Sequence, residues 1–556
     1  MAWRPARPSY SCYTLVFEAA FEAFFSLFTS KACAPPKPAI AGGIAARYDA
    51  GNGRNAGVTT LTSAIAIEAP PGAGTKSAPG LPLLASLLAA LLLIRILAIA
   101  ISAVDLHPDE AQYWYWAQDF AVGRYNGPPL VVWLAGLAGG VCGNGELCLR
   151  LPSPLLAIAT SFVVYALGRR LYDRRIAFWA ALAYATLPAV SVFSFVLTPD
   201  LPLAFFAAVG ALLLWLHFEK PSALTGLLLG VALGLGFDTG PGMIYLPIGA
   251  ALYALRTPSA RPVLKNWTSW LAVAVALVVA LPGLLAPSAA PVAWGIGSSF
   301  SANSLAHIFD PDSTLLFLGL QFVLLGPVFL FVYLRSVLAQ RVLSPRPRAD
   351  RFLLCLSLPV LVISLIQAFV LDGKAHWTLP AAPALTLFVT ALLLRYGFKR
   401  LLAFCIVLHA AILAVLVAVS TLADRTNIVG LDRLVGWRNF SLGLAQTVSA
   451  SDVKTVVLDR ADQAFEVLYY LRGSALDIRT FLPRGRAPRN DFQQQRGWAY
   501  GDSEPVLLAT GRNPSAFGIP LGAAAKIGDF PVASGLDPDG VLSLYRVNPP
   551  TDSLTP

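Results

Sequence analysis

Apolar residues come in long runs along the chain from Leu81 to about residue 424. Runs of this kind, with few charges inside them, are typical of membrane-spanning helices, which need about 20 apolar residues for a straight crossing. The two shortest, 222–237 and 241–255, are expected to be short helices that meet at a cavity. We expect eleven spans, near residues 81–104, 150–168, 176–196, 199–217, 222–237, 241–255, 267–286, 312–334, 352–371, 377–394 and 401–423.

Cationic residues gather between these runs, after the second, sixth, eighth and tenth expected spans. With eleven spans all four clusters fall on one side of the membrane, which the positive-inside rule assigns to the cytoplasm. We therefore expect a bacterial inner-membrane protein with a cytoplasmic N-terminus and a periplasmic C-terminus. The clusters are Arg169, Arg170, Arg174 and Arg175; Arg256, Arg261 and Lys265; Arg335, Arg341, Arg346, Arg348 and Arg351; and Arg395, Lys399 and Arg400.

The two ends of the chain differ in kind from the apolar middle, 81–425. Residues 430–548 have ordinary polarity, with expected strands at 455–458, 505–510 and 542–547 and a helix at 463–471. This pattern predicts a small periplasmic α/β domain. Residues 1–80 are rich in Ala, Gly and Pro and predict a disordered extension, and residues 549–556 a short tail.

The composition agrees with a lipid environment. The chain is 56% hydrophobic and 13% charged, whereas soluble domains carry roughly 25% charged residues. Its net charge is +10, but the cations lie in short clusters between apolar runs, which is typical of membrane orientation and argues against a nucleic-acid partner. Cys142 and Cys148 share one polar loop, and the sequence leaves open whether they form a disulfide or stay as thiols.

The first outer loop carries the most informative polar residues. Two adjacent carboxylates, Asp109 and Glu110, follow His107-Pro108 directly after the first expected span, and a series of aromatic residues comes next. A carboxylate beside a bilayer can serve as a general base when its surroundings tune its pKa. The alternative is a solvated loop in which Asp109 caps a helix, a position that Asp favours.

Two further outer segments offer candidate groups. Asp200 lies in the turn between the third and fourth expected spans, where a charge is costly and usually functional, unless the turn is simply hydrated. Lys374 and His376 lie together in a late outer loop. A cation near an outer acid suits a lipid-linked phosphate, and the alternative for Lys374 is an interfacial anchor.

These segments together resemble glycosyltransferase family 39. The run His107-Pro108-Asp109-Glu110-Ala111-Gln112-Tyr113-Trp114, followed by Gly127-Pro128-Pro129-Leu130, is similar to the first periplasmic loop of that family. The resemblance continues in the same order through 145–152, 198–206, Gln321, 326–327, 374–380, 436–438 and 468–471. It covers about residues 81–548, and no spacing in the chain predicts a metal site.

The resemblance implies an all-α polytopic membrane protein of the GT-C fold, with about eleven transmembrane helices. It implies transfer of a sugar, with inversion, from a polyprenyl-phosphate donor to a periplasmic lipid, glycan or protein acceptor. Membrane lipids are expected as further partners, and a divalent cation is left open as a cofactor. The implied base is Asp109, with Glu110 beside it; the implied substrate-binding residues are Asp200, Lys374, His376, Arg124 and His107.

The chain departs from the family pattern at two positions. Relatives often carry Lys or His where this chain has Gly127, and a lysine between the two short helices where it has Gly240. Two cations that would face the donor phosphate are therefore missing. This leaves a second hypothesis, a catalytically reduced member with a binding or scaffolding role. A transporter is a third, although the sequence shows no internal repeat and its acids lie at one face.

Overall fold

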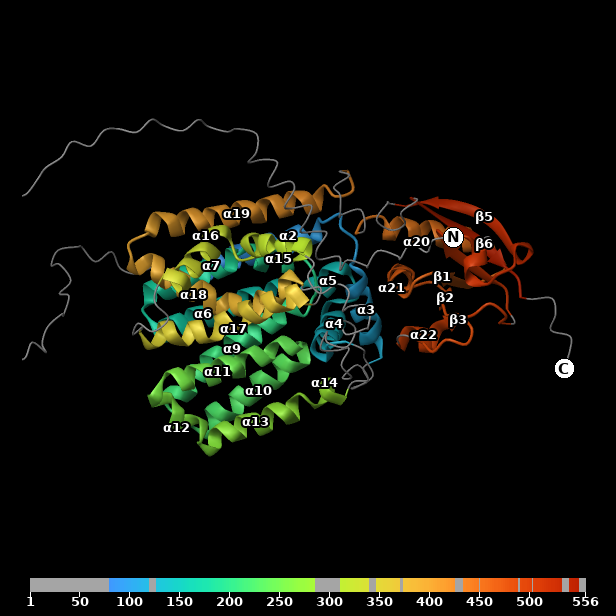
Figure 1. The fold of residues 1–556 in the computed structure, drawn as a ribbon. Helices are drawn as coiled ribbons and strands as arrows, with labels where there is room; N and C mark the ends of the chain where they lie inside the picture. The colour runs from blue at the N-terminus through green and yellow to red at the C-terminus, as the bar shows by residue number, and fades with distance from the viewer. Residues whose placement is uncertain are drawn as a thin grey trace, which may run out of the picture. The chain divides into compact units, whose positions relative to one another are not determined.

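The computed structural model describes residues 80–119, 127–285, 311–339, 347–370, 374–425, 434–449, 451–488, 491–502, 504–532 and 540–549. The expected N-terminal extension, nearly all of the C-terminal tail and the candidate residue Arg124 therefore lie outside the described residues. Within them, helices run alongside one another and a separate mixed sheet follows (Figure 1).

Each of the eleven expected spans is helical. Several are interrupted, most often at a proline, because proline lacks the amide proton of the helical ladder and starts a new first turn more readily than it continues a helix. The helices are α2 (Leu81–Ala100), α5 (Glu146–Arg150), α6 (Pro152–Leu171), α7 (Arg174–Thr186), α8 (Pro188–Phe193), α9 (Asp200–Glu219), α10 (Ala223–Thr239), η1 (Pro241–Ile244), α11 (Tyr245–Arg256), η2 (Pro258–Ala260), α12 (Arg261–Leu264), α13 (Trp267–Val279), α14 (Leu281–Leu285), α15 (Pro311–Leu324), α16 (Pro327–Ala339), α17 (Arg348–Val370), η5 (Ala375–Ala381), α18 (Ala382–Arg395) and α19 (Lys399–Thr421).

The expected span at 312–334 is not one straight helix. It consists of α15 and α16, which meet at an angle of 108°. The break lies at Gly326, whose φ of +80° favours glycine, and at Pro327, which starts α16. A side chain at position 326 would also meet the Nε2 atom of His409 at 2.5 Å, so glycine is needed there for space as well.

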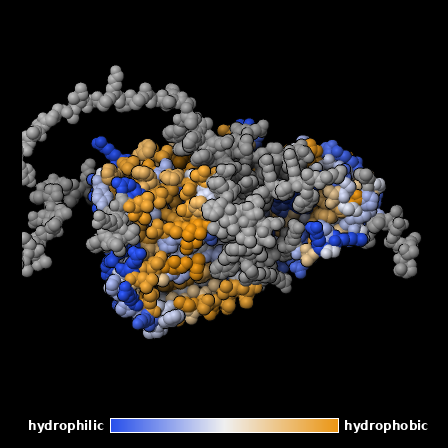
Figure 2. Space-filling view, viewed as in Figure 1, coloured by the Kyte–Doolittle hydropathy of each residue, from blue (hydrophilic) through white to orange (hydrophobic). Residues whose placement is uncertain are grey.

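Six helices in the described part of the chain are long and apolar enough to cross a membrane, or eight if each bent pair is one span. The chain is therefore a multi-pass membrane protein. Apolar residues cover the visible side of the helical part, and polar residues gather at its end (Figure 2). The count of eleven crossings stays a prediction, because helices such as α7, α10 and α11 are shorter than a straight crossing requires.

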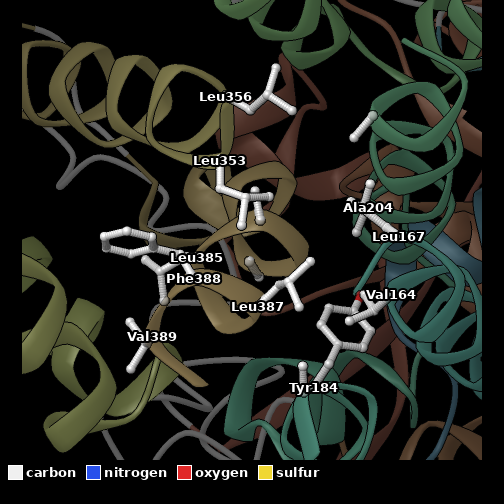
Figure 3. Packing of buried hydrophobic residues seen from close by; sticks show 14 of the residues in the cluster. Val164, Leu167, Tyr184, Ala204, Leu353, Leu356, Leu385, Leu387, Phe388 and Val389 are labelled. Carbon is white, nitrogen blue, oxygen red and sulfur yellow. The ribbon is translucent and has the colours of Figure 1, made fainter. Parts of the chain in front are cut away.

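The core of the helical part centres on α18. Leu385, Leu387, Phe388 and Val389 of that helix are buried on different sides of it, in a cluster formed with α6, α7, α9, α16 and α17 (Figure 3). In the hydropathy pattern α18 resembles the other spans, but it is buried on nearly all sides. A helix that is apolar all round is suited to such a central position.

Three of the four cationic clusters meet at one end of the helical part. Asp350 in the first turn of α17 accepts hydrogen bonds from Arg395 at the end of α18 and from Tyr172 after α6, at 2.7 Å in each case. Arg351 donates to the backbone oxygen of Arg256 at the end of α11. The expectation that these clusters share a side agrees with these contacts, whereas the assignment of that side to the cytoplasm stays a prediction from the positive-inside rule.

Two helices lie between α2 and α5. They are α3 (Pro108–Gln118) and α4 (Pro129–Cys142), and they pack against each other. A disulfide joins Cys142 at the end of α4 to Cys148 in α5. Of the two alternatives that the sequence left open for these cysteines, the structure shows the disulfide.

The last part of the chain forms a six-stranded sheet in the order β3-β2-β1-β4-β6-β5. The first four strands in this order are parallel, and β6 pairs antiparallel with both β4 and β5. The expected strands at 455–458, 505–510 and 542–547 are present as β1, β4 and β6, and the expected helix as α21. The elements are α20 (Trp437–Ser449), β1 (Thr455–Leu458), α21 (Ala461–Tyr470), β2 (Asp477–Phe481), α22 (Asp491–Arg496), β3 (Gly497–Trp498), β4 (Val506–Thr510), η6 (Pro514–Phe517), η7 (Leu521–Ala523), β5 (Ala524–Pro531) and β6 (Val541–Val547).

Candidate active site

The start of α3 is fixed by a reciprocal pair of hydrogen bonds. His107 is the residue before the helix, and its Nδ1 atom accepts a hydrogen bond from the backbone N–H of Asp109 at 3.1 Å. The carboxylate of Glu110 accepts one from the backbone N–H of His107 at 3.0 Å. This is a capping box in which histidine takes the place of the usual serine or threonine. His107, which the sequence placed among the substrate-binding residues, thus caps a helix, and the alternative that Asp109 is the cap is wrong.

Glu110 points into the protein and is completely buried. Both of its oxygens accept hydrogen bonds from the Arg150 guanidinium, at 2.9 to 3.2 Å. One oxygen also accepts from the backbone N–H of Leu197 at 2.8 Å. A carboxylate with all these partners has no free position for substrate. The geometry therefore assigns Glu110 a positioning role, in place of the catalytic role expected from its place beside Asp109.

Arg150, through its ion pair with Glu110 and its bonds to backbone oxygens, connects three separate segments. Besides Glu110, its guanidinium donates to the backbone oxygens of Val104 at 3.1 Å and of Asp105 at 2.7 Å. The end of the first span, the start of α3 and the turn before α9 are thereby held together. A planar guanidinium suits this task because its five N–H groups point in fixed directions.

Asp109 lies on the other side of α3, and 42% of its side chain is exposed. Successive residues on a helix point about 100° apart, so neighbours in sequence face different surroundings. The carboxylate lies 3.7 Å from the Nδ1 atom of His107. That contact is not an ion pair, since Nδ1 already accepts the backbone N–H of Asp109. Asp109 lies in the first turn of α3, where the helix dipole stabilises a negative charge.

Asp200, Lys374 and His376 lie close to Asp109. His376 interacts electrostatically with Asp200, Lys374 and Asp109, and Asp200 with His376 and Lys374. Asp200 is buried at the first turn of α9, Lys374 is exposed just before η5, and α9 packs against η5. The structure thus brings together four of the residues that the sequence proposed from three distant segments.

The late outer segment is held in place by Gln321 of α15. The Gln321 side chain donates to the backbone oxygen of Ala375 at 2.9 Å and accepts from the hydroxyl of Thr378 at 2.6 Å. The His376 ring also lies edge-on to Phe193 at the end of α8, with centroids 6.0 Å apart. These contacts fix the backbone that carries Lys374 and His376.

Tyr113 is a residue of this site that the sequence reasoning did not single out. It is buried one turn after Asp109. Burial, together with the negative charges of Asp109, Asp200 and Glu110, holds the pKa of its hydroxyl well above the usual value. Tyr113 therefore keeps its proton and can serve only as a neutral hydrogen-bond group. Its spacing of four residues from Asp109, on the same face of α3, is the signal that could have indicated it.

The two departures from the family pattern have different structural settings. A Cβ atom at Gly127 would meet the Trp116 ring at 2.5 Å, so the indole occupies the space that a longer side chain would need. At Gly240 the nearest atom to a Cβ is 3.9 Å away, and the backbone is extended. Near Gly240, Asp238 accepts a hydrogen bond from the backbone N–H of Gly283 at 2.9 Å and so ties α10 to α14. The Trp116 ring thus occupies the space that a cationic side chain at position 127 would need. At position 240 there is space for such a side chain, but this chain has glycine there.

The described residues bring together no three His, Cys, Asp or Glu side chains that could hold a metal ion. The divalent cation that the sequence left open therefore has no preformed donor set in the described ranges. Among the described residues, Lys374 is a cation whose charge acts on both Asp200 and His376.

The segment before the sheet contacts the same outer loop. Asp105 accepts a hydrogen bond from the backbone N–H of Gly436 at 2.8 Å, and Tyr470 donates to Glu146 and accepts from the backbone N–H of Leu106, each at 2.9 Å. Arg438 donates to Glu146 at 2.6 Å. The segments 436–438 and 468–471, which carry part of the family resemblance, therefore form the junction between α3 and the sheet.

Comparison with known proteins places these features in a family context. The family described as dolichyl-phosphate-mannose-protein mannosyltransferase matches residues 126–285. A lipid A galacturonosyltransferase of Rhizobium johnstonii is 26% identical over 469 residues, which is 82% of this chain and 95% of that protein. A lipopolysaccharide core galacturonosyltransferase of the same organism is 30% identical over 35% of this chain and 40% of that protein.

Solved structures agree on the fold. The structure of ArnT from Cupriavidus metallidurans bound to undecaprenyl phosphate matches with a TM-score of 0.55 at 16% identity, over 85% of this chain and 98% of that chain. The apo structure of the same protein matches with a TM-score of 0.54 over 83% and 97%. At this identity the similarity concerns the fold, which is that of the GT-C membrane proteins.

Proposed function

The chain belongs to the GT-C glycosyltransferases of the family-39 type, and on that premise we propose that it transfers a sugar from a polyprenyl-phosphate donor to an acceptor on the periplasmic side of the inner membrane. The observation that carries this proposal is the grouping of Asp109, Asp200, Lys374 and His376 at one site. The exposed carboxylate of Asp109 offers a base, and the exposed ammonium group of Lys374 offers a partner for a leaving phosphate.

Asp109 is the proposed base. Its carboxylate takes the proton of an acceptor hydroxyl, and that oxygen attacks the anomeric carbon of the donor sugar. The bond between this carbon and the phosphate oxygen breaks, so that polyprenyl phosphate leaves with the bonding electrons and the configuration inverts. A positioned base contributes roughly 10²–10⁴-fold to such a step. The Asp109 side chain is 42% exposed, so an acceptor hydroxyl can reach it.

Lys374 is the proposed partner of the donor phosphate. Its ammonium group is exposed, and the backbone after it is held through Gln321. A cation in this position neutralises the charge that develops on the leaving phosphate, which lowers the barrier more than it stabilises the bound donor. Asp200 and His376 then orient the acceptor or the sugar next to the same phosphate.

The relatives suggest which substrates to test first. Since the lipid A galacturonosyltransferase matches over nearly its whole length, we propose a galacturonic acid donor and a lipid A acceptor for this chain. The disulfide between Cys142 and Cys148 agrees with a periplasmic first loop, because disulfides persist in oxidising compartments.

The second candidate function is that of a binding or scaffolding subunit without turnover. The observation that favours it is the replacement of a cation by the Trp116 ring at Gly127 together with the absence of one at Gly240. The two functions make opposite predictions for donor consumption.

The test is release of polyprenyl phosphate. The protein, purified in detergent with native lipids, is supplied with undecaprenyl-phosphate galacturonic acid and lipid A, and both products are followed by mass spectrometry. The wild type should release polyprenyl phosphate and add one sugar to lipid A. Asp109→Asn, which is nearly isosteric, should lose roughly 10²–10⁴-fold in rate with an unchanged melting temperature.

The outcomes separate the candidates. Equal rates in the wild type and Asp109→Asn would leave transfer intact and remove Asp109 from the role of base. No release with any polyprenyl-phosphate sugar, although the protein binds undecaprenyl phosphate, would favour the binding subunit. Release with another sugar would retain the reaction and exclude galacturonic acid.

A further inference from the structure

The sheet at the end of the chain has the topology of a ligand-binding fold. Strands β1 to β4 are parallel, and β1 lies between β2 and β4. The chain moves outward from β1 to β2 and β3, and then returns to the other side of β1 to form β4. In open parallel sheets such a reversal separates the loops at the carboxyl ends of the two central strands, and ligands bind in the crevice that results.

A large cavity lies at the carboxyl ends of these strands. Its volume is about 1160 Å³. It is lined by residues that follow β1, β2, β3 and β4, among them Asp459, Arg484, Tyr500 and Arg512. Cavities that hold small molecules usually measure roughly 300–1,000 Å³, so this one has room for more than a single sugar or a free ion.

The lining of the cavity carries an excess of positive charge. Two of its four arginines are neutralised, since Arg512 pairs with Asp459 and Arg460 with Asp462. Arg484 and Arg486 line the same cavity, and in the described part of the chain neither side chain has a hydrogen bond or an ion pair. Two guanidinium groups without a counter-charge suit a ligand with anionic oxygens, which they bind through paired N–H groups.

The backbone makes room for one of these guanidinium groups. Gly501 follows β3 with a φ of +110°, a conformation that favours glycine. A Cβ atom at this position would overlap the Arg484 guanidinium. Any larger residue at position 501 would therefore displace Arg484 from the cavity wall.

The start of α21 adds to the same electrostatic environment. This ten-residue helix begins directly after the β1 loop, and no side chain caps its first turn. Its first residue, Ala461, lines the cavity. Uncapped N–H groups at a helix start favour an anion, and the helix dipole acts in the same direction.

Aromatic rings complete the lining. Phe481 and Phe517 contact each other edge-on with centroids 4.7 Å apart, and the Arg512 guanidinium lies 4.8 Å above the Phe517 ring. Tyr500 lies on the same wall. Phe481 and Tyr500, which are partly exposed, present apolar ring surfaces against which the carbon–hydrogen faces of a sugar can pack, while the arginines bind its charged substituents.

We propose that this cavity binds a phosphorylated saccharide, the head of the acceptor, separately from the transfer site at Asp109. The inference rests on the proposed function, because it assigns the ligand as the acceptor of that reaction. The free arginines recognise the phosphate groups, and the aromatic wall with the size of the cavity selects a saccharide over inorganic phosphate.

The test is direct binding to the full chain in detergent micelles, measured by calorimetry. The probe is a bisphosphorylated glucosamine disaccharide without acyl chains, and the unphosphorylated disaccharide and inorganic phosphate are run beside it. The wild type should bind the bisphosphorylated probe and bind the other two at least about tenfold more weakly. The Arg484→Gln, Arg486→Gln double variant should raise the Kd for the probe at least about tenfold, since each charge-assisted contact contributes on that order.

Arg546→Gln is the matched control. Arg546 lies in the same domain, is paired with Asp452 and does not line the cavity, so its removal should leave the Kd unchanged. Gly501→Ala serves as a second variant that moves Arg484 without removing a charge, and it should also weaken binding. Melting temperatures establish that each variant is folded.

Three results would overturn the inference: no binding of the probe by the folded wild type, equal binding by the double variant, or inorganic phosphate binding as tightly as the saccharide. Failure of the proposed function looks different. If the wild type binds the probe but releases no polyprenyl phosphate, only the transfer reaction is contradicted. If the double variant turns over with unchanged affinity for the acceptor, only the role of the cavity is contradicted.

Discussion

Two neighbouring residues of α3, Asp109 and Glu110, lie in two regions with very different surroundings. Glu110 is completely buried and is paired with Arg150 and with the backbone of Leu197. Asp109 has an exposed side chain, and its charge acts on His376. We name the first set, Glu110, Arg150 and the segments they bind, the anchor, and the second, Asp109, Asp200, Lys374 and His376, the reactive face.

The difference shows how one helix start can serve two purposes. The anchor uses every hydrogen-bonding position of its carboxylate to fix the backbone, and this fixes the direction of the next side chain. The reactive face leaves its carboxylate accessible, which a base requires. A rigid supporting shell of this kind holds a reacting group within the narrow geometry that transfer needs. The following experiments test whether the two sets are separable.

The largest expected effect is on the anchor. Glu110→Gln removes the charge that compensates buried Arg150, and breaking a buried pair in this way costs about 3–5 kcal/mol of folding free energy. We expect a much lower melting temperature in detergent. Activity per folded molecule should fall less than in Asp109→Asn. The control is Asp452→Asn, which breaks the exposed pair with Arg546 and should leave the melting temperature unchanged.

If Glu110→Gln melted like the wild type but lost turnover, the distinction between the anchor and the reactive face would be wrong. In that case Glu110 would belong to the reactive face, as its place beside Asp109 in the sequence suggested.

The next effect concerns the reactive face. Lys374→Met keeps a long apolar stem and removes the ammonium group. The loss of one charge-assisted contact costs about 1.5–3 kcal/mol, or roughly 10–100-fold. We expect this loss in kcat/KM for the polyprenyl-phosphate donor, with an unchanged melting temperature, because Lys374 is exposed and has no ion pair among the described residues. An unchanged kcat/KM would show that Lys374 is only an interfacial anchor, the alternative that the sequence left open.

The sequence predicted the reactive face better than it predicted the anchor. Asp109, Asp200, Lys374 and His376 each stand out as charged or titratable groups between apolar runs. Arg150 does not, since it lies two residues before a proline at the start of an apolar run and its partner is not apparent there. Its partner lies 40 positions away, and a long-range pair of this kind is visible only once the chain has folded.

The fold shows a similar division. Hydropathy located the helices of the eleven expected spans, because burial in lipid and burial in protein both require apolar residues. It did not indicate α3 or α4, which lie in the segment expected as the first outer loop. It did not reveal that α18 is a central helix, nor the 108° bend between α15 and α16. Both depend on which neighbours a helix packs against, and the local sequence of apolar and polar residues does not specify those neighbours.

The third experiment compares the two glycines that depart from the family pattern. Gly127→Ala should destabilise the protein by about 1–3 kcal/mol, because the added methyl overlaps the Trp116 ring. Gly240→Ala should be neutral or stabilise by about 0.4–1 kcal/mol, since its extended backbone accepts alanine and there is space for the side chain. Melting temperatures of the two variants, measured side by side, check this.

Gly240→Lys extends the same comparison to function. If the reactive face lacks only a cation at this position, the lysine should lower the KM for the donor without loss of stability. A rise in KM with an unchanged melting temperature would show that this chain holds the donor phosphate elsewhere.

The last experiment concerns a third carboxylate, Glu466 of α21, next to the anchor. It is completely buried, and neither of its oxygens has a hydrogen-bond partner in the described part of the chain. Burial raises its pKa well above the usual value, as do the negative charges of Asp105, Glu110 and Asp462, while Arg150 acts in the opposite direction. The folded state therefore holds a proton that the unfolded state releases at lower pH.

The sign of the pH dependence follows from this shift. Because the folded pKa is raised, stability is highest below the unfolded pKa and is lost as the pH rises through the folded one, with a slope of roughly 1.4 kcal/mol per pH unit. Glu466→Gln, which stays neutral, should remove this slope, so that the variant melts higher than the wild type above neutral pH and equally at low pH. Melting curves in detergent between pH 5 and pH 9 measure the difference. Parallel curves for the two proteins would mean that Glu466 titrates normally and that the junction between α3 and the sheet admits water.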